Sequence, residues 1–269
     1  MLKPHTADII QIARKAGEAI MAIYHAVDDS LQTSFKSDQS PLTAADLAAH
    51  QTIIKGLKAI TPGIPVLSEE SDAIPFEVRS QWQRYWLVDP LDGTREFIKR
   101  NGEFTVNIAL IEGQQAVMGV VYAPAINVLY YADETGAYRQ RGDATVTPIH
   151  VRKASIQNLT LAGSRSHADA RLDQFIHAIS QKLSPIKIIS MGSSLKICLV
   201  AEGAADIYPR LGPTSEWDTA AAQCILERAG GKIEDLDGER LHYNRKQSLL
   251  NPDFLAIGQS DFNWCQYLY

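Results

Sequence analysis

Apolar residues recur at helical spacing near the start of the chain, and short apolar runs follow them. The spacing predicts an amphipathic helix over about residues 6–25 and a second helix that begins near Thr43, a candidate N-cap, and runs to Ile60. Runs rich in β-branched and aromatic residues then predict strands at 65–68, 85–88, 104–112, 115–124 and 127–132. The last three are closely spaced and predict an antiparallel meander.

The pattern loosens between residues 140 and 157, where Gly, Pro, Thr and charged residues replace the apolar runs. We expect a boundary here between an N-terminal α+β half, 1–150, and a C-terminal α/β half, 151–269. Beyond it, apolar runs alternate with helical patterns, which favours crossover units on a mixed sheet and an α/β (mixed α+β) fold class. The expected strands are 159–163, 187–190 and 205–209, and the expected helices are 168–182, 194–202 and 218–229.

Composition and charge narrow the possible partners. The 269 residues hold 26 basic and 31 acidic side chains mixed along the chain, so no basic stripe is available for a nucleic-acid polymer. The three cysteines show no paired metal spacing and are typical of reduced thiols in the cytosol. No segment reads as a signal peptide or membrane span, so we expect a soluble protein. The aromatic tail, 262–269, is expected to dock on its own protein, with docking on a partner as the alternative.

The segment Asp89–Thr94 carries the strongest chemical signal. A buried strand is expected to end there in Asp89 and Asp92, and Pro90 between them stiffens the turn. Gly93 and Thr94 open a short helix whose free N–H groups would favour a phosphate. Asp-Gly is also a common turn signal between strands, which is the alternative interpretation.

Other acids lie at the ends of expected elements. Glu69 follows a strand, Asp218 begins a helix, and Asp46 lies in the first turn of another helix. Asp218 could be only an N-cap, and Asp46 could only compensate the helix dipole. Oxygen ligands without His or Cys favour Mg²⁺, and two such ions that share a carboxylate can clamp a phosphate ester and activate a water.

These motifs resemble both signature regions of the inositol monophosphatase superfamily, whose members are Mg²⁺-dependent, lithium-sensitive phosphatases. The resemblance rests on Glu69–Ser71, Asp89–Thr94 and Trp217–Ala221, and it covers nearly the whole chain. Residues 96–105, 164–167 and 192–196 are most similar to the CysQ-type 3'(2'),5'-bisphosphate nucleotidases within it. The resemblance implies a layered α-β-α-β-α sandwich of the inositol monophosphatase and sugar phosphatase type, with the site between two halves.

The resemblance also implies the metal ligands. Glu69, Asp89 and the backbone carbonyl of Leu91 would hold one Mg²⁺ ion. Asp89, Asp92 and Asp218 would hold a second, so that Asp89 bridges the pair, and two or three ions are expected in all. Most of the metal ligands thus fall in the N-terminal half, and Asp218 falls in the C-terminal half.

Catalytic roles are implied for Glu69 and Thr94, which would orient the attacking water. Asp46 would accept from the Thr94 hydroxyl, the amides of Gly93 and Thr94 would hold the scissile phosphate, and no covalent intermediate is expected. For the nucleotide, His167, Ser193, Lys196 and Arg210 match contact positions, although Lys196 could lie on a solvated helix face and His167 could cap a helix. The implied substrate-binding set is Glu69, Leu91, Asp92, Gly93, Thr94, His167, Ser193, Lys196, Arg210 and Asp218.

The implied activity is removal of the 3'-phosphate of adenosine 3',5'-bisphosphate to give AMP and phosphate, in support of sulfur assimilation. The sulfated precursor nucleotide, 3'-phosphoadenosine 5'-phosphosulfate, is implied as a second substrate. The alternatives are an inositol monophosphatase and a metal-binding regulatory domain without turnover. A cytoplasmic monomer or homodimer is expected, with peripheral attachment to the cytoplasmic face of the inner membrane left open by the resemblance.

Overall fold

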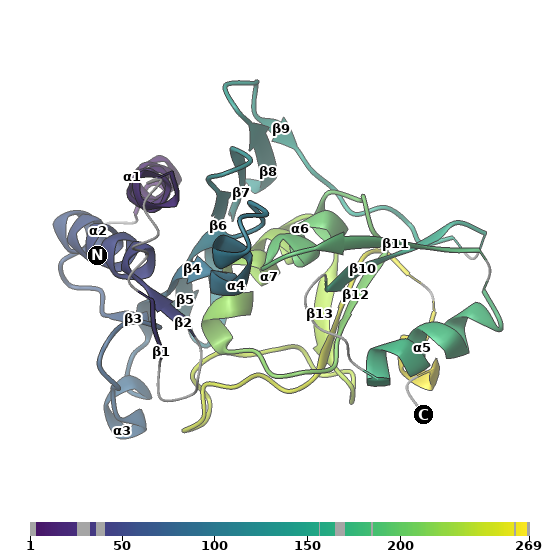
Figure 1. Ribbon diagram of the computed structural model, residues 1–269. Helices are drawn as coiled ribbons and strands as arrows, with labels where there is room; N and C mark the ends of the chain where they lie inside the picture. The colour runs from purple at the N-terminus through teal and green to yellow at the C-terminus, as the bar shows by residue number, and fades with distance from the viewer. Residues whose placement is uncertain are drawn as a thin grey trace.

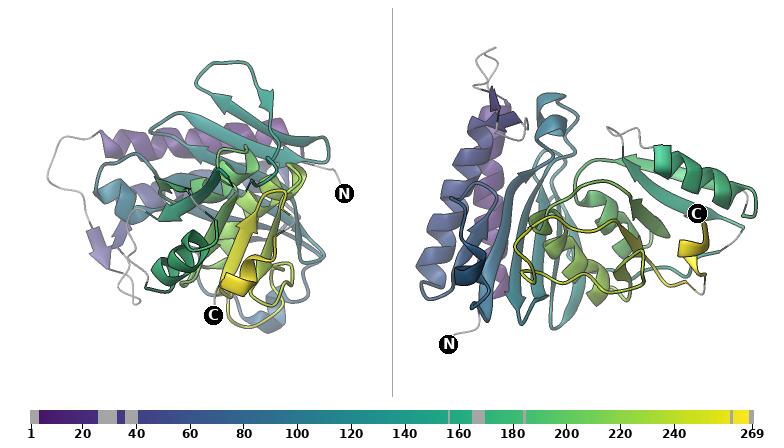
Figure 2. Two further views of the ribbon diagram at one scale, coloured as in Figure 1. Left: turned by 90° about the vertical axis from the view of Figure 1, so that its right-hand side faces the viewer. Right: turned by 90° about the horizontal axis from the view of Figure 1, so that it is seen from below.

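The structure is a computed structural model that describes residues 4–25, 33–35, 41–155, 157–164, 170–183, 185–260 and 262–267. The layers follow one another across the molecule as a helix pair, a sheet, a second pair of helices, a second sheet and an outer helix (Figures 1 and 2). The predicted α/β class and the layered α-β-α-β-α sandwich are therefore confirmed. Residue 167, a predicted nucleotide contact as His167, lies outside the described residues.

Helices form the outer and middle layers. Apolar residues of the first helix pair, such as Ile9 and Ile53, are fully buried against one face of the first sheet. The helices are α1 (Thr6–Tyr24), α2 (Ala44–Ile60), α3 (Phe76–Arg79), α4 (Thr94–Ile98), α5 (Ala170–Ser180), α6 (Leu195–Ala201), α7 (Glu216–Arg228) and the 3-10 helix η1 (Trp264–Tyr267).

The first sheet contains the predicted meander, which is confirmed. Its order in the described residues is β3-β4-β5-β6-β7-β8-β9, and all pairs are antiparallel except β3 with β4. The strands are β3 (Val66–Ser68), β4 (Arg84–Asp92), β5 (Thr105–Glu112), β6 (Gln115–Ala123), β7 (Val128–Asp133), β8 (Gly136–Arg141) and β9 (Thr147–Pro148). A separate short pair joins β1 (Thr33–Phe35) to β2 (Pro41–Thr43).

The predicted end of β4 at Val88 is wrong, because the strand continues to Asp92. Its pairing with β5 shifts register between Asp89 and Asp92, around Pro90, which has no N–H to donate to the ladder. The acids therefore lie within the strand, at an irregular part of it. The strands β8 and β9 were also not predicted, because their mostly polar residues lack an apolar run.

The second sheet has the order β11-β10-β12-β14-β13 in the described residues, with β10 parallel to β11 and β12. It confirms the three strands predicted in this half. The strands are β10 (Leu159–Ser164), β11 (Ile186–Met191), β12 (Ile207–Arg210), β13 (Lys232–Asp235) and β14 (Phe254–Ile257). The last two are four residues each and were not predicted.

Helix α7 joins the two sheets. It comes from the C-terminal half of the chain but packs on β4 to β8 of the first sheet, and one core contains Leu87 of β4, Ile225 of α7 and Ala256 of β14. The change of sheet between β9 and β10 falls in the predicted boundary region, while the division into two domains stays a prediction.

The aromatic tail docks on its own protein, as predicted. Trp264 is 2% exposed and packs in a core with Phe175 of α5. Among the described helices, none combines the length and the apolar character that a membrane span needs.

Candidate active site

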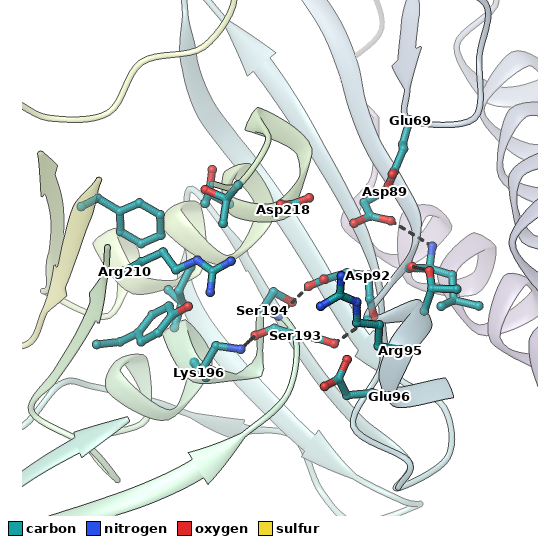
Figure 3. Close-up of a pocket in the computed structure, with 18 residues that line it drawn as sticks. Glu69, Asp89, Asp92, Arg95, Glu96, Ser193, Ser194, Lys196, Arg210 and Asp218 are labelled. Atoms are coloured by element: carbon teal, nitrogen blue, oxygen red, sulfur yellow. Dashed lines mark hydrogen bonds between the residues drawn. The ribbon is translucent and has the colours of Figure 1, made fainter. Parts of the chain in front are cut away.

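Three carboxylates meet where the first sheet faces α7. Glu69 directly follows β3, Asp89 lies in β4, and Asp218 lies in the first turn of α7. Their side-chain oxygens lie within 4.8 Å of one another (Figure 3). The amide of Glu69 donates to the carbonyl of Val88 at 3.1 Å, which holds the ends of the parallel strands β3 and β4 in place. We call Glu69, Asp89 and Asp218 the acid cluster.

Burial and mutual repulsion disfavour the charged form of the acid cluster. Burial raises the pKa of Asp89 well above its ordinary value, and the charges of Glu69 and Asp92 raise it further. The pKa of Asp218 is also raised, by burial first and by Asp92 next. A bound divalent cation would offset this repulsion, because it supplies positive charge between the carboxylates.

The ligand atoms of the acid cluster fit Mg²⁺. The residues described around the cavity include no His or Cys, and carboxylate oxygens are the ligands that hard cations prefer. At Mg–O distances of about 2.1 Å, ligand oxygens lie roughly 3–4 Å apart around one ion, which a cluster of this size accommodates. The chain thus has an acidic site that can hold a metal ion.

Leu91 and Asp92, predicted metal ligands, make other interactions here. The Asp92 carboxylate accepts from the Ser194 amide at 2.6 Å, and burial raises its pKa to about 6. The Leu91 amide donates to Asp89 at 3.0 Å, and the Leu91 carbonyl accepts from the Thr94 hydroxyl at 3.4 Å. Both residues line the same cavity as the acid cluster, and their metal-binding roles stay predictions.

Gly93 is positioned by a close contact from the second half of the chain. The hydroxyl of Ser193 donates to the carbonyls of Asp92 at 2.9 Å and Glu103 at 2.7 Å. A Cβ atom at Gly93 would lie 2.2 Å from that hydroxyl oxygen, and the φ of Gly93 is +90°. Only glycine meets both conditions. The N-terminal end of α4, at Thr94, is therefore held against residues 192–194, which we call the serine turn.

Asp46 lies near the acid cluster, as predicted. It is 1% exposed in the first turn of α2, and its charge contributes to the raised pKa of Asp89. Because Asp46 is buried, it is not a solvent-exposed residue that only compensates the helix dipole. Its hydrogen bond to Thr94 stays a prediction.

Lys196 and Arg210 reach the cavity from the second half of the chain. Lys196 is 6% exposed, and its ammonium donates to the carbonyl of Ser193 at 2.7 Å. Burial lowers its pKa to about 8, although the charge of Asp92 acts in the opposite direction. Arg210 of β12 donates to the carbonyl of Pro213 at 2.9 Å. The alternative that Lys196 lies on a solvated helix face is wrong, because its side chain is buried beside the cavity.

A single cavity of about 250 Å³ joins these groups. Of the predicted site residues, it brings together Glu69, Asp89, Leu91, Asp92, Gly93, Thr94, Ser193, Lys196, Arg210 and Asp218. Sequence reasoning missed other lining residues: Arg95, Glu96, Ser194, Ile197, Tyr208, Thr214, Thr219 and Phe254. Arg95 directly follows Thr94 in the sequence, and this position next to the predicted motif is a signal that could have identified it. The rings of Tyr208 and Phe254 meet edge to face at 6.0 Å across two strands, a contact with no local sequence signal.

Asp218 has a structural role as well. Ser215, not Asp218, is the N-cap of α7, and the Asp218 carboxylate accepts from the Ser215 amide at 2.9 Å in a capping box. The alternative that Asp218 is only an N-cap is therefore wrong, and the helix begins at Glu216, earlier than the predicted run that follows Asp218. The capping bond fixes one oxygen of Asp218, and the residue still contributes an oxygen to the acid cluster.

Comparison with known families and proteins gives consistent matches. The model of the inositol monophosphatase family matches residues 1–260. The chain is 52% identical over 246 residues to the 3'(2'),5'-bisphosphate nucleotidase CysQ of Salmonella typhimurium, and 45% identical over 250 residues to that of Buchnera aphidicola. These alignments cover 91% and 92% of this chain and 96% and 91% of the relatives.

Solved structures show the same similarity. The crystal structure of CysQ from Bacteroides thetaiotaomicron superposes with a TM-score of 0.84 at 42% identity, over 94% of this chain and 97% of the other. The extragenic suppressor protein suhB from Bartonella henselae superposes with a TM-score of 0.79 at 26% identity, over 97% of each chain.

Proposed function

The chain belongs to the inositol monophosphatase family, and on that premise we propose that it is a Mg²⁺-dependent 3'(2'),5'-bisphosphate nucleotidase. It hydrolyses the 3'-phosphate of adenosine 3',5'-bisphosphate to give AMP and phosphate. Relatives with this activity in their names share about half of their residues with the chain over most of its length. The observation that carries the proposal is the cavity that joins the acid cluster to Lys196 and Arg210.

The acid cluster and its neighbours would hold the metal ions. Glu69, Asp89 and the Leu91 carbonyl would be ligands of one ion, and Asp89, Asp92 and Asp218 would be ligands of a second. When bound, the ions supply charge to the scissile phosphate and lower the pKa of a ligated water. Two or three ions are proposed.

The residues around the ions position the reactants. Glu69 and the Thr94 hydroxyl orient the attacking water, and Asp46 accepts a hydrogen bond from Thr94. The amides of Gly93 and Thr94 hold the scissile phosphate at the first turn of α4. Because water attacks directly, no side chain becomes phosphorylated. The serine turn supports this arrangement through the hydrogen bonds of Ser193 to Asp92 and Glu103.

The opposite end of the cavity holds the nucleotide. Lys196 and Arg210 bind the phosphate that is not cleaved, and Ser193 and His167 contact the rest of the nucleotide. 3'-Phosphoadenosine 5'-phosphosulfate is a second substrate, since its 5' group is also anionic. We place the enzyme in the cytoplasm, where it removes a by-product of sulfate activation as a monomer or homodimer.

A phosphate-release assay tests this function. The wild type should prefer adenosine 3',5'-bisphosphate to an inositol monophosphate. In Lys196→Met or Arg210→Ala, kcat/KM for the bisphosphate should fall about ten- to a hundredfold, since a hydrogen bond between charged groups contributes about 1.5–3 kcal/mol. The inositol ester has no second phosphate and should lose far less.

Three outcomes would contradict the proposal. A wild type that prefers the inositol ester would be an inositol monophosphatase. A protein that releases no phosphate from any ester in Mg²⁺ would be a metal-binding domain without turnover. Equal losses on both substrates in the two variants would make Lys196 and Arg210 structural residues.

A further inference from the structure

Arg95 is a third cation on the cavity and has no role in the function described so far. It is the second residue of α4, directly after Thr94, and its side chain is exposed where it lines the cavity. Figure 3 shows its guanidinium group turned into the cavity, on the side that faces Arg210. The backbone of α4 fixes its base, since the amide of Lys99 donates to the Arg95 carbonyl at 2.9 Å.

The three cations differ in the partners that they already have. The Lys196 ammonium donates to the carbonyls of Ser193 at 2.7 Å and Met191 at 3.4 Å, and Arg210 donates to the carbonyl of Pro213. For Arg95, by contrast, the structure gives no hydrogen bond or ion pair within the part of the chain that it describes. Its five N–H donors therefore remain available to a ligand.

Acids near Lys196 increase the need for another cation. The charges of Asp92, Glu96 and Glu103 all act on the Lys196 ammonium and partly neutralise it. Among the described residues that line that end of the cavity, a phosphate monoester with nearly two negative charges would meet the cations Lys196 and Arg210. The scissile phosphate, in contrast, lies at the acid cluster, where metal ions supply the charge.

We propose that Arg95 is a specificity-determining residue that binds the phosphate which is not cleaved. It donates two parallel N–H bonds to that phosphate, a geometry that guanidinium groups form with phosphate oxygens. This inference rests on the proposed nucleotidase function. It adds Arg95 to Lys196 and Arg210 as a third cation that contacts the same phosphate.

The test compares Arg95→Gln with a matched control, Lys99→Gln, which removes one positive charge from the end of the same helix without touching the cavity. The substrates are adenosine 3',5'-bisphosphate and adenosine 3'-monophosphate, which differ only in the phosphate that is not cleaved. In Arg95→Gln, kcat/KM for the bisphosphate should fall about tenfold, while that for the monophosphate falls less than about twofold. Lys99→Gln should leave both within about twofold, and Arg95→Lys should restore part of the loss.

Product inhibition gives a second measurement, because AMP keeps the uncleaved phosphate. Arg95→Gln should raise the inhibition constant of AMP about tenfold and leave that of inorganic phosphate unchanged. Equal losses on the two substrates, a rise confined to inorganic phosphate, or values that match Lys99→Gln would each overturn the inference. A wild type that does not hydrolyse the bisphosphate would overturn the proposed function, and the inference with it. The three outcomes for Arg95→Gln, in contrast, would overturn the inference and leave the proposed function intact.

Discussion

The two ends of the cavity contrast in how their polar groups are satisfied. In the acid cluster, Glu69, Asp89 and Asp218 bring their oxygens within 4.8 Å of one another, and burial and repulsion raise the pKa values of both aspartates. In the serine turn, Ser193 donates to two carbonyls at 2.7 and 2.9 Å, and the Ser194 amide donates to Asp92 at 2.6 Å. The charged form of the acid cluster is disfavoured unless a cation binds, whereas these donors of the serine turn already have partners within the protein.

This difference indicates that the acid cluster takes part in the chemistry and that the serine turn holds the site in position. Groups that repel one another in the absence of a ligand are arranged for that ligand, and they gain most from its binding. Groups that are fully hydrogen-bonded contribute mainly to position. Substitutions in the acid cluster should therefore cost turnover, whereas substitutions in the serine turn should cost stability and precision.

The largest effect is expected for Asp89→Asn, which removes the charge shared by both metal ions but keeps the shape of the side chain. Turnover should fall about a thousandfold or more, because a bridging ligand supports both ions at once. The circular dichroism spectrum and the cooperative thermal transition should be unchanged. Asp143→Asn, on an exposed turn, is the control. If Asp89→Asn kept a tenth of the activity at saturating Mg²⁺, the bridging role would be wrong.

A smaller effect is expected for Thr94→Ala, which removes an orienting hydroxyl rather than a charge. We expect kcat to fall about ten- to a hundredfold, while the Mg²⁺ concentration at half-maximal activity changes little. Thr52→Ala is the matched control, since its hydroxyl bonds to a helix carbonyl away from the cavity. Loss of Mg²⁺ affinity with full kcat in Thr94→Ala would contradict the orienting role.

The stability of the metal-free protein should depend on pH because of the acids. The pKa values of Asp89, Asp92 and Asp218 are raised in the folded state, that of Asp92 to about 6, so the folded state binds more protons than the unfolded state above pH 4. The contribution of Asp92 to stability is present at low pH and lost as the pH rises through about 6, and those of Asp89 and Asp218 are lost as the pH rises through their own raised pKa values. In the presence of a chelator, Tm should be lower at pH 7 than at pH 5, by about 2–4 °C for each kcal/mol of unfolding free energy that is lost.

Mg²⁺ should reverse this trend, because it binds the deprotonated carboxylates. The increase in Tm on adding Mg²⁺ should be larger at pH 7 than at pH 5. In chelator, the Tm of the Asp92→Asn variant should change less with pH than that of the wild type. This comparison separates the effect of the acids from that of His50 and His242, whose lowered pKa values act in the opposite direction. A chelated protein that becomes more stable from pH 5 to pH 7 would show that the acid cluster is not repulsive.

The smallest effect on turnover is expected for the serine turn. Ser193→Ala removes both hydrogen bonds of the hydroxyl, and we expect kcat/KM to fall only a few-fold and Tm to fall by about 2–5 °C. Ser193→Gly loses the same bonds but relieves the positive φ of 51°, so it should be less destabilised than Ser193→Ala. A loss of turnover as large as that of Thr94→Ala would place Ser193 in direct contact with the reacting phosphate.

The residues of the acid cluster could be proposed from sequence because their signals are local: Glu69 follows a strand, Asp89 precedes Pro90, and Asp218 lies near a helix start. The resemblance, not the strand ends, placed them in one ligand set, since β4 continues past Asp89. The serine turn could be assigned a nucleotide contact by resemblance, but not its bonds to Asp92 and Glu103, which join residues about a hundred positions apart. Whether the N–H donors of Arg95 are available to a ligand likewise depends on hydrogen bonds in the folded chain, which the sequence does not show.

The position of α7 has a consequence for the order in which the protein becomes active during synthesis. The ribosome makes all of β4 to β8 long before Asp218, yet α7 covers those strands and completes the acid cluster. A nascent chain that ends before α7 exposes the apolar face of the first sheet and lacks one of the three carboxylates. Such contacts between distant segments form late and slowly, so the emerging chain is open to aggregation until its last quarter leaves the exit tunnel. A complete acid cluster is therefore available only after α7 has been made.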